Sequence, residues 1–334
     1  MKKMNINDAA RELGVSASTV SRSLSGKGRI SKETRRRVIE YAREHGWDPE
    51  LIERAERGRR KTETVAVILP EVDELVEQPF FYACMSGVNE MALANGYDML
   101  VIIAGQEDLT HLKRVTESGK ADGVILMRTY RNDSSAAWLK AAGIPFVSVG
   151  SLDDNSAVQV DYDNAGACRD LTAILLARGM RRIAYLGPDD GKIVNEERYA
   201  GYLQAYEESG LKVGKEYVCR ERLTPSGTRK MVERFLEEGA DCILCQDDAV
   251  CTAVLKELRI RGVKIPEEIK VASCYNSRFL ENYPVTVTTL DFNAIESGRE
   301  TCRLLLEMLR GQAVPVKTVL SHEVLLKEST EIRE

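Results

Sequence analysis

A short segment near the N-terminus is rich in side chains that donate hydrogen bonds to anions. Hydroxyl and guanidinium groups follow one another closely there, at Ser16, Ser18, Thr19, Ser21 and Arg22. Such groups bind phosphate oxygens and base edges, and the neighbouring Ala17 can contact a thymine methyl group. The segment therefore predicts contacts with DNA. Its many hydroxyl groups make it a poor apolar surface for a protein partner.

The spacing of apolar residues predicts three short helices that would position these donors. Apolar residues recur at intervals of three and four residues, at Ile6, Ala9, Ala10 and Leu13. Asn5 is placed to cap this first helix, and Ser16 to cap a second one that runs from Ala17 to about Leu24. A third helix is expected after Ser31. Two helices around a glycine turn, braced by a third, form a helix-turn-helix unit whose second helix enters the major groove. The alternative is a three-helix module that binds protein.

The net charge of the chain is divided unequally along its length. The 334 residues sum to −5, but residues 1–63 carry 16 Lys and Arg against 10 Asp and Glu, a net charge of +6, and the remainder carries −11. A small basic head on a large acidic body is typical of a protein that docks on a polyanion through one end. The alternative is a solvated pair of terminal helices without a ligand.

Several functional classes are excluded by the composition. No apolar stretch approaches the ~20 residues that cross a bilayer, and the polar N-terminus lacks the apolar core of a signal peptide, so we expect a cytoplasmic protein without membrane contact. The eight cysteines are scattered, and Cys242 and Cys245 lie within a run that reads as a buried strand. The three histidines are far apart. We therefore expect no disulfide framework, no metal site and no cofactor.

From residue 64 onward, short apolar runs alternate with segments of helical periodicity. Ten runs read as strands, at residues 64–70, 97–103, 121–127, 144–150, 157–162, 181–187, 216–220, 240–245, 269–275 and 286–291. Repeated strand–helix–strand alternation implies an α/β fold with parallel sheets covered by helices on both faces. Ten strands suggest two Rossmann-like sheets with a ligand cleft at the carboxyl ends of the strands.

Enzyme motifs are weak in this body. The segment from Gly187 to Lys192 is one residue short of a phosphate loop, and neither a G-x-G-x-x-G motif after a strand nor a G-x-S-x-G motif is present. Carboxylate pairs such as Asp247-Asp248 usually cap helices. We therefore expect a protein that is not an enzyme. The alternatives are a small-molecule-binding module without DNA function and an α/β enzyme with an unrelated basic head.

The run NINDAARELGVSASTVSRSLSGKGRISKETRRRVIEYAREHGWDP resembles the DNA-binding head of the lactose-repressor (LacI/GalR) family of bacterial transcription regulators, and its GVSxxTVSRxLSG core is specific. The resemblance implies that Ala17, Ser18 and Arg22 read base edges. Together with the linker that follows the head, it implies a DNA-contacting set formed by Asn5, Ser16, Ala17, Ser18, Thr19, Ser21, Arg22, Arg29, Leu51, Ile52 and Arg54. The expected partner is double-stranded, near-palindromic operator DNA, bound by a homodimer or a higher oligomer.

The resemblance extends over the body, which is similar to type I periplasmic sugar-binding proteins. It implies a head at residues 1–48, a linker at 49–63 and an effector-binding body at 64–334. Within the body, it implies an N-subdomain at about 64–161 and 292–321 and a C-subdomain at about 162–291 and 322–334. The expected function is a transcriptional regulator, a repressor, whose operator affinity is controlled by a sugar or a sugar-phosphate-like ligand between the subdomains.

Five body residues match effector-contacting positions of the family: Phe80, Phe81, Arg198, Gln246 and Asn276. Arg198 matches an arginine that reaches ligand hydroxyls or carboxylate, while Phe80 and Phe81 stand where aromatic residues contact a ring or pack in the core. Gln246 replaces an asparagine, and Asn276 replaces an aspartate that accepts hydroxyl hydrogen bonds. Because a carboxylate is lost and Arg198 is kept, we expect the pocket to tolerate a phosphorylated or acidic ligand better than a neutral sugar.

The linker departs from the family pattern. In the family, paired hinge helices enter the minor groove and a leucine wedges into a central base step. Glu50, Glu53 and Glu56 stand here for the asparagine, the alanine and that leucine. A carboxylate is not an apolar wedge, and phosphates repel it. Three alternatives follow. Leu51 or Ile52 inserts between the bases in place of the leucine, the hinge helix lies further from the minor groove, or the DNA has no central kink.

We predict that this protein bends its operator less than typical relatives do. Circular-permutation gel shifts measure the bend, and only a weak central kink is expected. A strong central kink that is lost on changing Glu56 alone would contradict the prediction.

Overall fold

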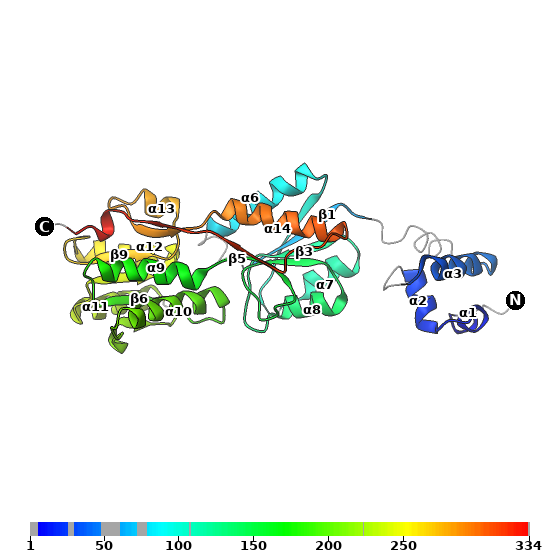
Figure 1. Ribbon diagram of the computed structural model, residues 1–334, viewed down its shortest axis with the longest axis horizontal. Helices are drawn as coiled ribbons and strands as arrows, with labels where there is room; N and C mark the ends of the chain where they lie inside the picture. The colour runs from blue at the N-terminus through cyan, green and yellow to red at the C-terminus, as the bar shows by residue number, and fades with distance from the viewer. Residues whose placement is uncertain are drawn as a thin grey trace. The chain divides into compact units, whose positions relative to one another are not determined.

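The computed structural model describes residues 6–25, 30–47, 61–71, 79–106, 108–222 and 224–332. The chain divides into two units, Met1–Thr62 and Glu63–Glu334. Figure 1 shows the helices of the first unit and the two sheets of the second. Some of the residues predicted to contact DNA lie outside the described residues, namely Asn5, Arg29, Leu51, Ile52 and Arg54.

Three helices pack around a small apolar core in the first unit. They are α1 (Ile6–Leu13), α2 (Ala17–Ser25) and α3 (Lys32–Glu44). Ser16 accepts a hydrogen bond from the Thr19 backbone N–H at 3.1 Å, and Ser31 accepts one from Thr34 at 3.0 Å, so these serines begin α2 and α3. The core between the helices is formed by Ala9, Ala10, Val20, Leu24, Val38, Ile39, Tyr41 and Ala42. The predicted helix-turn-helix arrangement is confirmed.

Six parallel strands form the first sheet of the second unit, in the order β11-β5-β4-β3-β1-β2. The strands are β1 (Thr64–Leu69), β2 (Asp98–Ile103), β3 (Gly123–Leu126), β4 (Phe146–Val149), β5 (Val158–Tyr162) and β11 (Lys317–Leu320). One face packs against α6 (Pro79–Ala94) and α14 (Ala294–Leu309), and the other against α7 (Thr110–Glu117) and α8 (Ser134–Ala142). We call this sheet with its helices the N-lobe.

A second sheet of six strands has the order β12-β10-β9-β8-β6-β7, and only β12 runs antiparallel to its neighbour. The strands are β6 (Ile183–Leu186), β7 (Val218–Cys219), β8 (Cys242–Cys245), β9 (Lys270–Ser273), β10 (Thr288–Asp291) and β12 (Glu323–Leu325). One face packs against α9 (Asn164–Ala177) and α10 (Ile193–Glu208), and the other against α11 (Pro225–Glu237) and α12 (Asp248–Arg261). With the short α13 (Arg278–Glu281), this is the C-lobe.

The α/β class and the two parallel sheets agree with the prediction, and all ten predicted strands are present as β1 to β10. Strands β11 and β12 were not predicted. Both lie at sheet edges and contain only exposed and half-buried residues, so neither forms the continuous apolar run by which the other strands are recognised.

The chain crosses between the lobes three times, after β5, after β10 and after β11. An aromatic ring lies at each crossing. Tyr162 and Phe292 have ring centroids 4.7 Å apart, and Phe292 and His322 have centroids 6.3 Å apart. The Tyr162 hydroxyl also donates a hydrogen bond to the Asn293 carbonyl oxygen at 2.8 Å. These three rings, which we call the hinge cluster, join the crossings into one packed group.

Glycines allow two helix pairs to approach closely, α6 with α14 and α9 with α10, which lie side by side in Figure 1. A Cβ atom on Gly298 would lie 1.9 Å from the Cys84 carbonyl oxygen, and one on Gly87 would lie 2.0 Å from that of Ile295. In the C-lobe, a Cβ on Gly201 would lie 2.0 Å from the Ala165 carbonyl oxygen. Backbone atoms cannot yield as a flexible side chain can, so each pair requires glycine at the contact.

Substituting Gly298→Ala is therefore expected to lower the free energy of unfolding by about 1–3 kcal/mol, because α14 must move away from α6. Urea denaturation of the full chain measures this. Gly214→Ala is the matched control, since its new methyl group would meet only the movable end of Glu216, and its effect should stay within about 0.5 kcal/mol. An unchanged unfolding midpoint for Gly298→Ala would contradict the close approach of the helices.

Candidate functional site

The predicted recognition helix presents its polar side chains to solvent. Ser16, Ser18, Ser21 and Arg22 are exposed, while Ala17 and Thr19 are half-buried. The Ser16 hydroxyl lies 2.8 Å from those of Ser18 and Thr19. The N-terminus of α2 thus gathers three hydroxyl groups at the positive end of the helix dipole, which is an arrangement suited to a phosphate oxygen.

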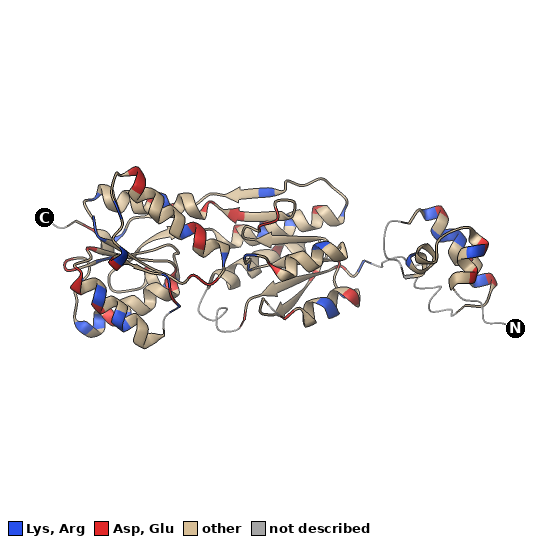
Figure 2. Cartoon of the chain, turned by 90° about the horizontal axis from the view of Figure 1, so that it is seen from below, with Lys and Arg blue, Asp and Glu red and all other residues tan. Residues whose placement is uncertain are grey.

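Two basic residues of α3 contact other residues of the same helical unit. Arg37 donates a hydrogen bond to the Leu13 carbonyl oxygen at 2.9 Å and so satisfies the end of α1, and Arg36 lies 3.8 Å from Glu40. Figure 2 shows basic and acidic residues interspersed along the helices of this unit. Positive charge alone therefore does not identify which face of this unit would contact DNA. The hydroxyl-rich start of α2 is the more specific indication.

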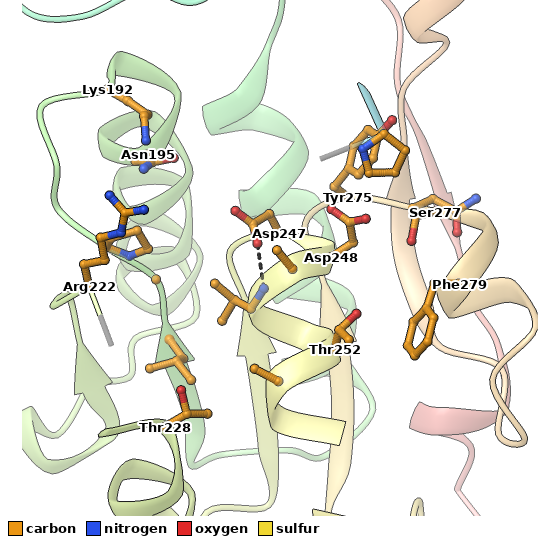
Figure 3. A pocket seen from close by; sticks show the side chains of 18 of the residues that line it. Lys192, Asn195, Arg222, Thr228, Asp247, Asp248, Thr252, Tyr275, Ser277 and Phe279 are labelled. Carbon is orange, nitrogen blue, oxygen red and sulfur yellow. Dashed lines mark hydrogen bonds between the residues drawn. The ribbon is translucent and has the colours of Figure 1, made fainter. Parts of the chain in front are cut away.

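A cleft lies between the two lobes at the carboxyl ends of their strands. It has an outer chamber of about 1120 Å³, bordered by α6 of the N-lobe and by α12 and α13 of the C-lobe. A smaller inner chamber of about 90 Å³ adjoins it. Five residues line both chambers: Arg128, Asn195, Asp247, Asp248 and Tyr275. Figure 3 shows Asp247 and Asp248 at the start of α12, with Lys192 and Asn195 at the start of α10 on the other side.

Aromatic rings form much of the inner chamber. Phe80 is half-buried between the cores of both lobes, and its ring lies edge-on to Tyr275 at 5.9 Å. Phe81 is almost fully buried, and the Arg128 guanidinium lies over its ring at 4.5 Å. Both phenylalanines line the inner chamber, as does Phe292 of the hinge cluster. The chamber therefore offers apolar faces against which a ligand ring can pack.

Arg198 lies in the inner chamber, on α10, and is only 9% exposed. One terminal nitrogen donates a hydrogen bond to the Gln246 carbonyl oxygen at 2.8 Å, and the guanidinium lies 5.7 Å from the Phe292 ring centroid. The buried Nε has no hydrogen-bond partner within the described residues. Such a donor is costly unless a ligand satisfies it, so Arg198 fits the effector-contacting role predicted for it.

Of the two predicted amide contacts, Gln246 lies outside both chambers and Asn276 lines the outer one. Gln246 is fully buried and lines neither chamber, because its side-chain oxygen accepts a hydrogen bond from the core residue Tyr185 at 2.9 Å. Asn276 lines the outer chamber, but its amide nitrogen already donates to Glu281 at 2.9 Å and to Asp291 at 3.1 Å. Gln246 is thus held away from the ligand space, and Asn276 is committed to other protein groups.

The carboxyl groups of Asp247 and Asp248 are features of the cleft that the sequence did not assign to ligand binding. Asp247 caps α12 by accepting a hydrogen bond from the Val250 backbone N–H at 2.8 Å, as expected for such a pair. Asp248, the first residue of α12, is 4% exposed and does not act as the cap. Burial, and then the negative charge of Asp247, raise the pKa of the Asp248 carboxyl to about 7.

Among the described residues, no group of three or more histidine, cysteine, aspartate or glutamate side chains is arranged to hold a metal ion. Over the same residues, no helix combines the length and the hydrophobicity that crossing a bilayer requires.

Comparisons with known proteins agree with both units. The model of bacterial regulatory proteins of the lacI family matches residues 5–50, and that of the periplasmic binding protein-like domain matches residues 172–330. The transcriptional regulator CelR of Thermobifida fusca is 28% identical over 325 residues, covering 95% of each chain. This chain belongs to the LacI family.

Further relatives of this LacI-family regulator span almost its whole length. Catabolite control protein A of Priestia megaterium is 26% identical over 337 residues, covering 98% of this chain and 99% of the relative. The solved structure of a CelR–cellobiose complex superposes with a TM-score of 0.74 at 27% identity, covering 98% of this chain and 99% of that one. These relatives are transcriptional regulators and not enzymes, in agreement with the expected function class.

An ion-pair network joins the lobes of this LacI-family regulator beside the cleft. Arg131, in the loop after β3 of the N-lobe, binds Glu196 on α10 of the C-lobe through Nε at 2.8 Å and a terminal nitrogen at 2.6 Å. It also binds Asp153 of its own lobe. The Arg131 backbone N–H donates to the Gly191 carbonyl oxygen at 2.9 Å, next to a β-bridge between Tyr130 and Lys192. These contacts stabilise the present angle between the lobes.

Glu196→Gln is expected to shift the lobes toward an open arrangement by about two- to fivefold in population, because a half-exposed ion pair contributes up to about 1 kcal/mol. Pulsed electron resonance between spin labels at Glu117→Cys and Lys230→Cys measures the distance between the lobes. The eight native cysteines are buried and should resist labelling.

Asp153→Asn is the matched control, since it removes the Arg131 partner within the N-lobe and leaves the contact between the lobes. Identical distance distributions for Glu196→Gln and the wild type would show that the ion pair does not hold the lobes.

Proposed function

We propose that this LacI-family transcriptional regulator is a repressor that binds near-palindromic operator DNA through its head, residues 1–48, as a homodimer or higher oligomer in the cytoplasm. We further propose that a sugar bound between the lobes controls its affinity for the operator. The observation that carries the proposal is the presence, in one chain, of a helix-turn-helix unit with a hydroxyl-rich recognition helix and a two-lobed body with a polar cleft.

Base reading is assigned to Ala17, Ser18 and Arg22, and phosphate contacts to Ser16, Thr19, Ser21 and Arg22. The three hydroxyls at the start of α2 and the exposure of Arg22 support this division. The remaining proposed contacts are Asn5, Arg29, Leu51, Ile52 and Arg54, which lie outside the described residues.

Effector control follows from linkage between the cleft and the head. A ligand that binds one angle between the lobes more tightly shifts the population toward that angle, and operator affinity changes by the same factor by which DNA changes ligand affinity. Such couplings typically amount to about 1–3 kcal/mol. The relative crystallised with cellobiose supports a sugar as the ligand class, and the aromatic faces and polar groups of the cleft suit one.

Selection of bound sequences from random duplex DNA tests the proposal and would yield the operator. Arg22→Ala is expected to weaken binding to the selected operator by tenfold or more, because a side chain that reads a base edge contributes about 1–3 kcal/mol of discrimination. Fluorescence anisotropy at several salt concentrations measures this, and wild-type affinity should fall steeply with salt.

Arg36→Ala is the matched control, because it removes an exposed positive charge from α3 rather than from α2, and a loss below threefold is expected. If no sequence is enriched, or if both variants lose the same affinity, the proposed role of α2 fails.

A further inference from the structure

The Asp248 side chain lies where the two chambers of the cleft meet. It is the first residue of α12 and lines both the inner and the outer chamber. Asp247 already caps the helix, so capping does not explain a second buried carboxyl at this point. In Figure 3, Asp248 lies on the side of α12 that faces Tyr275 and Ser277.

Two buried polar groups at this junction interact with each other but have no other hydrogen-bond partner within the described part of the chain. One is Oδ1 of Asp248, whose side chain is 4% exposed, and the other is Oγ of Ser277, which is 7% exposed. A buried polar group without its full set of hydrogen bonds is unfavourable and is uncommon in native proteins. A pair of buried polar groups that meet only each other beside an open chamber, together with the unsatisfied Nε of Arg198, points to a ligand that supplies both donors and acceptors.

The charges around Asp248 decide what kind of ligand group it can accept. Asp247 on the same helix destabilises the ionised carboxyl, while Arg198 on α10 and the nearby Ser277 hydroxyl stabilise it. Tyr275, on the segment after β9, also faces it. With a pKa of about 7, Asp248 exists in both forms near neutrality, and a ligand hydroxyl that donates to it favours the ionised form. An anionic ligand group would face two carboxyls instead.

The positions that carry amide or carboxylate ligands in the family are not available for this purpose. Gln246 points into the core, and Asn276 is held by Glu281, Asp291 and also Lys327, whose Nζ lies 3.3 Å from its oxygen. We propose that Asp248, supported by Ser277 and Arg198, is the carboxylate that accepts the effector's hydroxyl hydrogen bonds, and that the effector is a neutral sugar at this end. The inference rests on the proposed function and reverses the acidic-ligand expectation drawn from the sequence.

The test uses the full-length protein and isothermal titration with glucose, galactose, cellobiose and maltose, and with glucose 6-phosphate, glucuronate and galacturonate as acidic counterparts. At least one neutral sugar is expected to bind, and each of the three acidic compounds to bind at least tenfold more weakly than the tightest neutral sugar. Asp248→Asn should weaken the tightest neutral sugar by at least tenfold, and Ser277→Ala by about three- to tenfold. Glu221→Gln, which removes a carboxylate from the outer chamber alone, should stay within twofold.

Circular dichroism checks that the variants fold, and Ser277→Ala carries the test if Asp248→Asn does not. The inference is overturned if both variants bind with wild-type affinity, if only the acidic sugars bind, or if none of the seven compounds binds. Operator selection requires no effector, so its failure would count against the proposed regulator function and not against the role of Asp248.

Discussion

Three passages of the chain between two sheets constrain the whole body of this protein. Each lobe contains strands from both sides of a crossing. The two lobes are therefore joined by three chain segments and do not fold or move independently of each other. The motion that leaves both sheets intact is a change of the angle between the lobes about the crossings, where Tyr162, Phe292 and His322 pack together. A parallel sheet also brings the carboxyl ends of its strands to one edge. The same topology therefore creates both the cleft and the hinge that opens it.

Much of the fold could be predicted from the sequence because buried parallel strands are continuous apolar runs. The runs from 64–70 to 286–291 each correspond to a strand, whereas Lys317–Leu320 and Glu323–Leu325, with one side open to solvent, lack that pattern. The head was predictable for a different reason. Ser16 and Ser31 mark the starts of two helices by local capping, and the regular spacing of apolar residues marks the faces that pack into the shared core.

The cleft was harder to predict because ligand contact depends on where a side chain points. Gln246 follows a strand whose alternate residues face opposite sides, and the Tyr185 hydroxyl draws it into the core. Asp247 and Asp248 are equivalent as a sequence pattern and both line the cleft, but in three dimensions only Asp247 also caps the helix. Likewise, sequence comparison identifies position 276 as one where the family has an aspartate and this chain has an asparagine. It does not reveal that Asp248, at the start of α12, brings a carboxyl group to the same cleft.

The position of Phe292 links two properties of a regulator that are usually considered separately. Its ring lies in the hinge cluster, lines the inner chamber and carries the Arg198 guanidinium on one face. A change at this position made to fit a new ligand would also change how easily the lobes rotate. Selectivity and responsiveness can therefore evolve independently only at positions outside the hinge, such as 248 and 277. A lineage that acquires a new sugar is expected to vary there first and to keep the ring at 292.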